Sequence, residues 1–531
     1  MKGAELIVKT LERYSVSHIF GLPGDATSFF RALTKSPIQF ITMRNEQGVG
    51  YAINGYARVA KKPGVAYVSR GAGGTNVLTG IACAYLEGTP AIFITDQVSR
   101  KESIYPDSYM FINLEDIYRP VSKGVDVVWR AQDIPDIMSR AWADAKRKTP
   151  GPRCIIVPQD VFNEDTDPIY LDPVVSEDVE IDSLGAVERL QYHLEKSGYP
   201  ILIFGPGIKE FVRSEELKSF LDRISVPFFT TRHAKGIIYE THPLHYGVAR
   251  NDILSALSPQ IDLVITLGYN ISDKDDEYSW WLDRTKIEHI DISDSPPIET
   301  LCFQPAEKFR VDWKDFFQLA QEKLPVRSHP TLFRLSSQEW QERCRRMTLD
   351  RFGDFLLGDV LNQNNLGAIL TSDDIITVET GLTRRYILTV FKSCGPHIIG
   401  SGTLSALGFS VPAAIGASIA DPNARVVVIC GDGALLMNVS ELATIRRLKL
   451  PVKIIVVADG SYGYMKYLQY EAFGSCVGVD FTNPDFELLA RAFGFEYLGV
   501  HQETELELVR SLIEDRNNPA LIVLYQKYQY K

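Results

Sequence analysis

Two aspartates, Asp432 and Asp459, each follow an apolar run typical of a buried strand, RVVVICG (425–431) and KIIVVA (453–458). If these strands are parallel neighbours, both aspartates lie at the carboxyl edge of the sheet, where ligands bind in open α/β folds. Two carboxylates there, with the carbonyl oxygen of Ser461 as a third protein oxygen, suit a magnesium ion. Magnesium prefers oxygen ligands and shares them with phosphate and water. A Gly-Asp-Gly turn by itself is common and carries no chemistry.

A glutamate, Glu46, stands where a predicted strand passes into a helical pattern, in MRNEQGVGYAINGYAR (43–58). A lone glutamate at such a junction is most often a favourable charge at a helix N-terminus. The Gly-rich run SRGAGGTNVLTGIACAY (69–85) follows the next strand. Taken alone, that run is a turn with Thr75 or Asn76 as a helix cap. Each pattern therefore has an ordinary structural explanation when it is considered in isolation.

In this order and spacing, the patterns resemble the decarboxylase and acetohydroxyacid synthase family of thiamine diphosphate enzymes. The carboxyl-terminal segment is similar to the family's Gly-Asp-Gly … Asn-Asn motif, with Ala458 and Asp459 in place of the two asparagines. The segment that starts at Glu46 is similar to the family run that ends in Gly-Tyr-Ala-Arg. ILIFGPG (201–207) and LVITLG (263–268) also fall in the family's order. The resemblance covers essentially the whole chain.

The resemblance implies thiamine diphosphate and Mg²⁺ as cofactors. By that resemblance Glu46 hydrogen-bonds N1′ of the aminopyrimidine and relays protons through the cofactor, which is general acid–base catalysis. It also implies that the cofactor lies between two subunits, and therefore a homodimer or homotetramer with active sites at the interface. The implied metal ligands are Asp432, Asp459 and Ser461. The implied cofactor-binding residues further include Asn76, Thr380, Gly381, Leu382, Ala406, Leu407, Gly431, Gly433, Ala434, Tyr462, Gly463 and Tyr464.

Some segments resemble the decarboxylases more than the synthases. GLPGDAT (21–27) places Asp25 where decarboxylases have an active-site aspartate, so Asp25 is the second predicted catalytic residue. VETG (378–381) also resembles the decarboxylase sequence. However, the decarboxylase His-His pair is missing from 105–115, and Met465 stands where those enzymes have a glutamate.

Synthase features are missing as well, because Met110 replaces a glutamine and Leu468 replaces a tryptophan that recognises the second 2-oxo acid. We predict cleavage or formation of a carbon–carbon bond next to a carbonyl. The main expectation is decarboxylation of a 2-oxo acid, with aldehyde release or carboligation to an acyloin. The alternative is an acetolactate synthase-like transfer of a two-carbon unit. FAD is not expected, because YGVARND (246–252) lacks the synthases' Gly-rich flavin loop.

Arginines are candidates for binding the substrate carboxylate, because a guanidinium pairs with a carboxylate bidentately. An arginine is more often an ordinary surface residue than a substrate ligand. The predicted substrate-binding residues are Asn45, Arg70, Met110, Arg384 and Met465, and Arg385 is a further candidate.

The elements that must position these residues alternate short apolar runs with helical patterns, which indicates parallel α/β sheets. A polar stretch at 163–184 and a charged stretch at 326–350 separate three such units. The predicted fold class is α/β, with three domains that are each a mainly parallel sheet flanked by helices. These are a pyrimidine-binding domain (1–165), a central domain (185–330) and a diphosphate-binding domain (350–531).

Composition excludes several classes of protein. Of the 531 residues 45% are hydrophobic and 23% are charged, as in ordinary globular proteins. The net charge is −11 without a basic run, so we expect no nucleic-acid partner. No apolar stretch reaches the roughly 18 residues of a membrane span, so no membrane partner is expected. Seven scattered cysteines without a Cys-x-x-Cys pair favour a reducing cytoplasm.

Two rival interpretations stay open at this point. A nicotinamide dehydrogenase is disfavoured, because no Gly-x-Gly-x-x-Gly run opens a helix. The second rival is a catalytically degenerate relative that acts as a binding protein. It is motivated by Ala458, Asp459 and Asn45, which depart from the family pattern. The presence of Glu46 and Asp432, the residues that the implied chemistry needs most, argues for an enzyme acting on a small 2-oxo acid.

Overall fold

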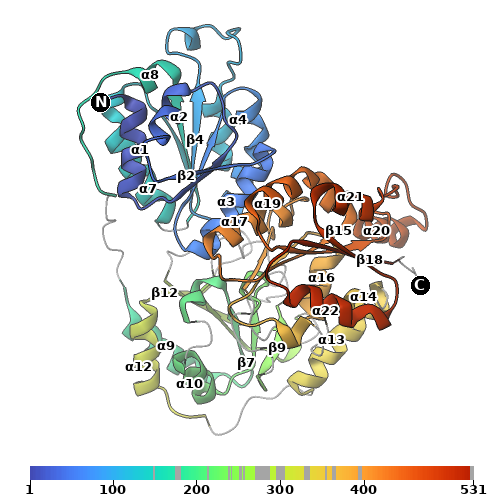
Figure 1. Ribbon diagram of the computed structural model, residues 1–531. Coiled ribbons are helices and arrows are strands. Elements are labelled where there is room, and N and C mark those ends of the chain that lie inside the picture. Colours follow the sequence, from blue (N-terminus) through green and yellow to red (C-terminus); the bar gives the residue numbers. More distant parts are fainter. Residues whose placement is uncertain are drawn as a thin grey trace.

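The computed structural model describes residues 1–147, 150–173, 181–211, 215–236, 240, 242–249, 254, 258–269, 287–294, 305–327, 335–352, 356–361, 366–392 and 397–526. These residues form three six-stranded sheets. Figure 1 shows them as three units, with the first in blue, the second in green and yellow, and the third in orange and red. The predicted α/β class with three helix-flanked parallel sheets is confirmed.

The first sheet has the strand order β2-β1-β3-β4-β6-β5, and all its printed pairs are parallel. Its central strands are buried along their whole length, as their apolar runs predict. The strands are β1 (His18–Gly21), β2 (Gln39–Thr42), β3 (Gly64–Val68), β4 (Ala91–Gln97), β5 (Gly124–Val127) and β6 (Pro152–Pro158). The helices are α1 (Gly3–Arg13), α2 (Thr27–Leu33), α3 (Glu46–Ala60), α4 (Ala72–Asn76), α5 (Leu78–Leu86), α6 (Leu114–Tyr118), α7 (Ile134–Lys146) and α8 (Gln159–Asn163).

The third sheet repeats this order as β14-β13-β15-β16-β18-β17. The identical order supports the first and third domains as copies of one fold. The strands are β13 (Ile375–Val378), β14 (His397–Gly400), β15 (Val426–Gly431), β16 (Lys453–Ala458), β17 (Glu496–Val500) and β18 (Ala520–Tyr525). The helices include α16 (Leu382–Thr389), α17 (Ser410–Ala420), α18 (Asp432–Met437), α19 (Leu442–Leu448), α20 (Gly463–Phe473), α21 (Phe486–Phe493) and α22 (Leu506–Glu514), preceded by α13 (Ser337–Phe352).

The middle sheet has a different order, β12-β11-β10-β7-β8-β9. This is the doubly wound order of dinucleotide-binding folds, and fold alone does not assign a ligand. The strands are β7 (Pro200–Phe204), β8 (Phe228–Thr230), β9 (His245–Val248), β10 (Leu263–Leu267), β11 (Glu288–Ser293) and β12 (Glu307–Arg310), with helices α9 (Ser183–Lys196), α10 (Glu215–Ile224) and α12 (Trp313–Lys323).

The first and third domains share one hydrophobic core, which joins residues of both sheets. Helices α3 and α17 cross between them at very close range. A Cβ at Gly55 would overlap the Ala413 carbonyl, and a Cβ at Gly416 would overlap the Ala52 carbonyl. Glycine at these positions lets the two backbones touch, so α3 is fixed against the third domain.

The sequence predicted most of the buried strands but missed others, among them β6 and β11, as well as half-exposed strands. Ten apolar runs predict strands, and each of them forms one: 38–44, 64–69, 91–95, 201–205, 227–231, 262–268, 375–379, 425–431, 453–458 and 521–525. By contrast, β5, β12 and β17, whose residues are partly exposed, carry no continuous apolar run. The exact domain boundaries stay a prediction. Cys83 and Cys430 lie in apolar runs, which predict burial, and both are buried. Among the described residues, no helix is long and apolar enough to cross a membrane.

Candidate active site

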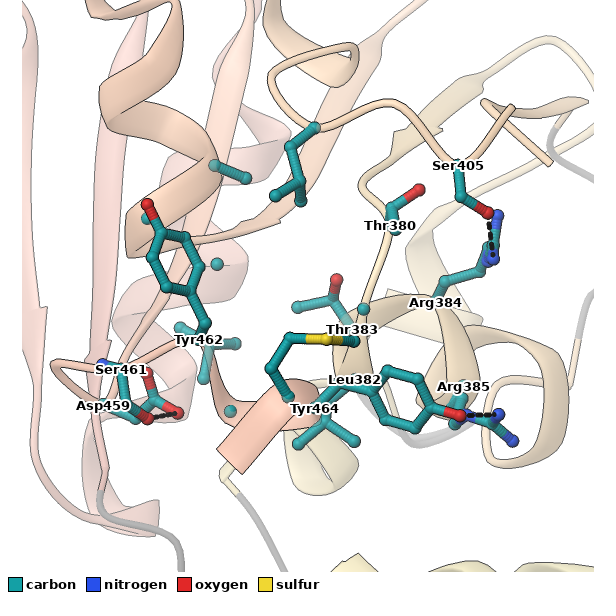
Figure 2. Close-up of a pocket in the computed structure, with 18 of the residues that line it drawn as sticks. Thr380, Leu382, Thr383, Arg384, Arg385, Ser405, Asp459, Ser461, Tyr462 and Tyr464 are labelled. Carbon is teal, nitrogen blue, oxygen red and sulfur yellow. Dashed lines mark hydrogen bonds between the residues drawn. The ribbon is translucent and has the colours of Figure 1, made fainter. Parts of the chain in front are cut away.

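Asp432 and Asp459 lie at the adjacent ends of β15 and β16, as the sequence predicts. The two strands pair in parallel. Asp432 is almost completely buried and accepts hydrogen bonds from the N–H groups of Gly433 and Gly460, both at 2.8 Å. Asp459 accepts bonds from the Ser461 N–H at 3.0 Å and the Ser461 hydroxyl at 3.1 Å. Figure 2 shows Asp459 and Ser461 together at one end of a pocket.

The two carboxylates make this end of the pocket negative. Burial and then the neighbouring Asp432 carboxylate raise the pKa of Asp459 to about 7. A divalent cation would relieve this repulsion, and the hard oxygen donors fit Mg²⁺. Among the described residues, no three His, Cys, Asp or Glu side chains are grouped to hold a metal. Further ligands would therefore be the Ser461 carbonyl, phosphate oxygens and water.

Asn483, before α21, completes the surroundings of Asp432 and was missed by the sequence analysis. Its Nδ2 donates to Asp432 at 2.6 Å, while its buried Oδ1 has no hydrogen-bond partner. An unsatisfied buried oxygen on a side chain bonded to Asp432 is a further polar group for a hydrated cation. No local signal marks Asn483, because it lies 51 residues after Asp432 in the chain.

A pocket of about 440 Å³ extends from this acidic end along α16 and the start of α20. A Cβ at Gly381 or Gly431 would meet no atom within 4 Å, so both glycines leave open space along the wall. This space fits an extended cofactor whose diphosphate approaches the backbone closely. The predicted residues that line the pocket are Thr380, Gly381, Leu382, Leu407, Gly431, Asp432, Gly433, Ala434, Asp459, Ser461, Tyr462, Gly463 and Tyr464, together with Arg384 and Met465.

Other predicted residues do not line this pocket. Ala406 is buried beside it, and its N–H donates to the Ser401 hydroxyl at 3.1 Å. The predicted residues of the first domain, Asp25, Asn45, Glu46, Arg70, Asn76 and Met110, are also absent from its wall. Within one chain, the pocket is therefore built from the second and third domains alone.

The opposite end of the pocket from Asp459 is cationic (Figure 2). Arg384 donates to the Ser401 carbonyl at 2.6 Å, and it is the arginine that holds the 401–405 loop. Burial and then the nearby Arg232 charge lower the pKa of Arg384 to about 10. Arg385 donates to the Tyr464 hydroxyl at 2.6 Å and lies over its ring at 4.6 Å. Three arginines thus line an end of the pocket where the described lining residues include no carboxylate.

Glu46 is the first residue of α3 and lies at the surface of the first domain. Its Oε2 accepts a hydrogen bond from Asn76 Nδ2 at 3.1 Å. Asn45 caps the helix by accepting from the Gln47 N–H at 2.8 Å. The structure thus brings Glu46 and Asn76 together, and it gives Asn45 a backbone role rather than a free amide. Met110, at a φ of 62°, lies against Gly71 at the edge of the same area.

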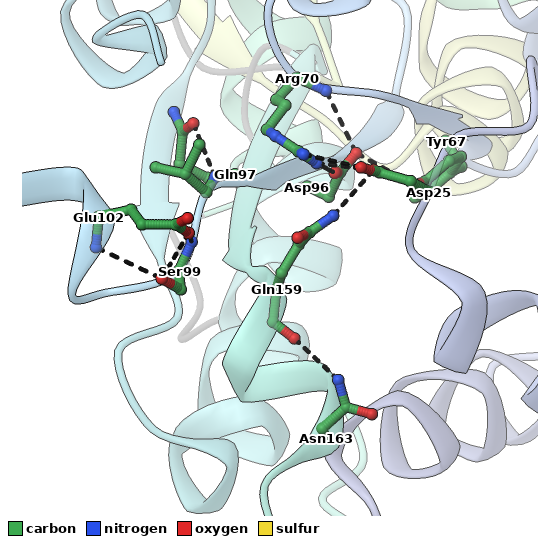
Figure 3. A network of polar contacts seen from close by, with 10 residues as sticks. Asp25, Tyr67, Arg70, Asp96, Gln97, Ser99, Glu102, Gln159 and Asn163 are labelled. Carbon is green, nitrogen blue, oxygen red and sulfur yellow. Dashed lines mark hydrogen bonds and ion pairs between the residues drawn. The ribbon is translucent and has the colours of Figure 1, made fainter. Parts of the chain in front are cut away.

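Asp25 is held by Arg70, as Figure 3 shows. Arg70 donates to both Asp25 oxygens, at 2.7 and 2.8 Å, and to the buried Asp96 at 2.6 Å. Gln159 donates to Asp25 at 2.8 Å. The Arg70 hydrogen bonds lower the pKa of Asp25, so this exposed carboxyl stays ionised. Because two carboxylates already occupy Arg70, the geometry favours a positioning role for it over substrate contact.

Asn438, followed three residues later by Glu441, has the sequence spacing of a helix capping box, so the sequence predicts one here. The box does not form, so this prediction is wrong. The segment Val439–Glu441 is a 3-10 turn, and Asn438 makes no side-chain cap bond. Glu441 instead accepts hydrogen bonds from the N–H groups of Arg44 and Asn45 in the first domain. A tertiary contact has replaced the local cap, which the spacing of residues cannot reveal.

Comparison with known proteins agrees with this geometry. Three family models of the thiamine pyrophosphate enzymes match the chain. The N-terminal TPP binding domain matches residues 1–111, the central domain residues 187–296, and the C-terminal TPP binding domain residues 379–524. The chain is 30% identical to the probable acetolactate synthase large subunit of Methanocaldococcus jannaschii, over 93% of this chain and 86% of that protein. It is 28% identical to the acetolactate synthase isozyme 2 large subunit of Escherichia coli K12, over 98% and 95%. The Lactococcus lactis acetolactate synthase large subunit is also 28% identical, over 99% and 93%.

Proposed function

The chain belongs to the acetohydroxyacid synthase-like family of thiamine pyrophosphate enzymes, and from this membership we propose that it transfers a two-carbon unit between 2-oxo acids. In the proposed reaction, a 2-oxo acid such as pyruvate loses carbon dioxide. The remaining acyl unit is joined to the carbonyl carbon of a second 2-oxo acid. The relatives therefore favour the alternative of the sequence analysis over simple decarboxylation to an aldehyde.

The third domain supplies the proposed cofactor site. Asp432, Asp459 and the Ser461 carbonyl would hold Mg²⁺, and the backbone at Gly431 and Gly433 would approach the diphosphate. When bound, thiamine diphosphate supplies a nucleophilic carbon and an electron sink for the bond that breaks. Leu407 also lines the pocket and would bend the cofactor toward its reactive shape.

Glu46 would exchange a proton with N1′ of the aminopyrimidine through its carboxyl oxygen. One of its oxygens already accepts from Asn76, which orients the group. Because the pocket of one chain lacks every predicted first-domain residue, we propose that Glu46 serves the pocket of a second subunit. Exposed apolar side chains at the two half-sites support burial in such a dimer, among them Tyr109 (85% exposed), next to Met110, and the pocket-lining Met465 (47% exposed).

The fate of the acyl unit depends on whether a proton donor lies beside it. Apart from Asp432 and Asp459 at the metal end, no carboxyl group lines the described pocket, and Met465 occupies the wall. Asp25 from the first domain is the remaining candidate acid. Because Arg70 lowers its pKa, Asp25 lacks a proton to give at neutral pH. Aldehyde release requires a proton donor, so this shortage of acids is the observation that favours carboligation over aldehyde release.

We propose that the substrate carboxylates are bound at the cationic end of the pocket. Arg384 and its neighbour Arg385 contribute guanidinium groups there, and Arg232 adds a third from the middle domain. Such groups bind carboxylates with charge-assisted hydrogen bonds. They would replace the tryptophan whose position is occupied by Leu468.

The test is a product balance with pyruvate in the presence of thiamine diphosphate and Mg²⁺, with and without FAD. Transfer predicts one acetolactate for each carbon dioxide released and little acetaldehyde. Acetaldehyde in equal amount to carbon dioxide would overturn the transferase proposal in favour of decarboxylation. Cofactor binding without any carbon dioxide from a panel of 2-oxo acids would favour the binding-protein alternative.

A further inference from the structure

A carboxylate of the third domain is built into the first domain directly beside Glu46. Glu441 is fully buried. Its Oε1 accepts from the Arg44 N–H at 2.8 Å and from the Asn45 N–H at 3.2 Å. Its Oε2 accepts from the Thr444 hydroxyl at 2.6 Å. The two peptide groups that it binds are those that immediately precede Glu46.

The start of α3 is shaped to receive this carboxylate. A Cβ at Gly48 would lie 2.9 Å from Glu441 Oε1, so a side chain there would displace the carboxylate. The position is favourable for a negative charge, because the first N–H groups of a helix carry partial positive charge. Neighbouring contacts join the same two segments: Asn438 donates to Gln47 at 3.4 Å, and Arg447 donates to the Thr42 carbonyl.

The carboxylate form is needed for this arrangement. One oxygen accepts two N–H groups while the other accepts a hydroxyl, and a neutral amide offers one accepting oxygen instead of two. Burial raises the pKa of Glu441, whereas the Thr444 and backbone hydrogen bonds oppose that rise. Removing the side chain would leave two part-buried peptide N–H groups without their carboxylate partner just before Glu46.

We propose that Glu441 is a positioning residue that fixes the Glu46 carboxyl for proton exchange with the aminopyrimidine. This inference rests on the proposed function, which assigns that exchange to Glu46. Proton exchange requires the two groups to be within hydrogen-bond reach, so a shift of about 1 Å in the backbone slows the step about 100-fold. Glu441 prevents that shift by holding the peptide groups on the N-terminal side of Glu46.

A second buried glutamate provides a matched control. Glu87 is also fully shielded between the first and third domains, and it accepts from the Thr403 N–H at 2.8 Å. It pairs with His233 of the middle domain at 2.9 Å. Glu87 lies after the end of α5, so its contacts hold the domains together without touching the start of α3. Comparing the two separates positioning of Glu46 from general docking of domains.

The experiment compares wild type, Glu441→Gln, Glu441→Asp and Glu87→Gln, each with thiamine diphosphate and Mg²⁺. The principal measurement is the rate at which the bound cofactor exchanges its C2 proton for deuterium, read by NMR after an acid quench. Three further measurements are made on each protein. Calorimetry gives the cofactor affinity, and thermal unfolding gives the midpoint temperature. Amide hydrogen exchange is measured in the cofactor-free protein for the peptide that contains Arg44 and Asn45.

Glu441→Gln is expected to slow C2 exchange 10- to 100-fold, with cofactor affinity within about threefold of wild type. It should also speed amide exchange at Arg44 and Asn45. Glu441→Asp, whose shorter carboxylate keeps the charge, is expected to lie between Glu441→Gln and wild type. Glu87→Gln should lower the thermal midpoint while leaving C2 exchange within about twofold of wild type.

If Glu441→Gln exchanges the C2 proton at the wild-type rate, the inference is overturned. It is also overturned if Glu87→Gln slows exchange as much as Glu441→Gln does, because that result would indicate domain docking alone. These outcomes are distinct from failure of the proposed function. A wild type that exchanges the C2 proton rapidly but converts no 2-oxo acid refutes the proposed reaction and leaves the variant comparison decisive. A wild type without cofactor-dependent exchange refutes both.

Discussion

Replacing Asp459 by asparagine should change how metal binding depends on pH. In the cofactor-free protein, burial and the adjacent Asp432 carboxylate raise the pKa of Asp459 to about 7. A divalent cation needs the ionised carboxylate, so binding below this pH displaces a proton. For one proton, each pH unit below about 7 weakens binding about tenfold, which equals about 1.4 kcal/mol.

Asp459→Asn keeps an oxygen ligand and abolishes this titration. The ratio of variant to wild-type affinity for Mg²⁺ with thiamine diphosphate should therefore rise about fivefold between pH 7 and pH 6, because Asp459 is already half protonated at pH 7. It should flatten above about pH 8, where Asp459 is ionised and its extra charge favours the metal. The titration of the cofactor's own phosphate is common to both proteins and cancels in the ratio.

The same substitution should affect the stability of the cofactor-free protein with a defined sign. The pKa of Asp459 is higher in the folded protein than in the unfolded chain. Between about pH 4 and about pH 7, Asp459 therefore keeps its proton in the folded protein and loses it in the unfolded chain. The free energy of unfolding consequently falls as the pH rises through this range. Asp459→Asn should therefore raise the thermal midpoint at pH 8 and change it little at pH 4.5.

Calorimetry at pH 6, 7 and 8, in two buffers with different ionisation enthalpies, counts the displaced proton directly. We expect close to one more proton released by wild type than by Asp459→Asn at pH 6. An affinity ratio that stays constant from pH 6 to pH 8, with equal proton release, would refute the coupling between Asp432 and Asp459.

Three further perturbations test other parts of the site. Glu46→Gln should lower turnover about 100- to 10,000-fold with cofactor affinity nearly unchanged; turnover within tenfold of wild type would contradict the proton relay. Arg70→Gln leaves the buried Asp96 carboxylate unpaired, so the free energy of unfolding should fall by about 3–5 kcal/mol, and an unchanged denaturation midpoint would argue against the network. Gly416→Ala places a methyl group against the Ala52 carbonyl and should cost about 1–3 kcal/mol, read from the denaturant midpoint; full stability would show that α3 and α17 can separate.

The oxygen site and its strands followed directly from the sequence. Continuous apolar runs at 425–431 and 453–458 predict buried parallel strands, because both faces of such strands are covered by helices. Parallel strands place their ends at one edge, so Asp432 and Asp459 had to be close. Their raised proton affinity depends in addition on burial, which the sequence does not quantify.

The partners of the first-domain residues were decided by tertiary structure. Arg70 was predicted as a substrate ligand from its charge, yet it lies between Asp25 and Asp96, which are distant in sequence. Periodicity cannot show such pairs, because the side chains meet through packing of different strands. The separation of Glu46 from the pocket of its own chain likewise depends on how whole domains dock.

The sequence by itself determined the fold class, the buried strands and the positions of the chemical groups, because these follow from residue type and from spacing between near neighbours. Apart from the pairing of Asp432 with Asp459, only the tertiary structure decided which groups meet. Glu441 has the spacing of a local helix cap, but its carboxylate binds peptide groups 396 and 397 residues away. Docking of the first domain on the third buries that carboxylate, and a buried carboxylate takes the hydrogen-bond donors that the docked surface presents.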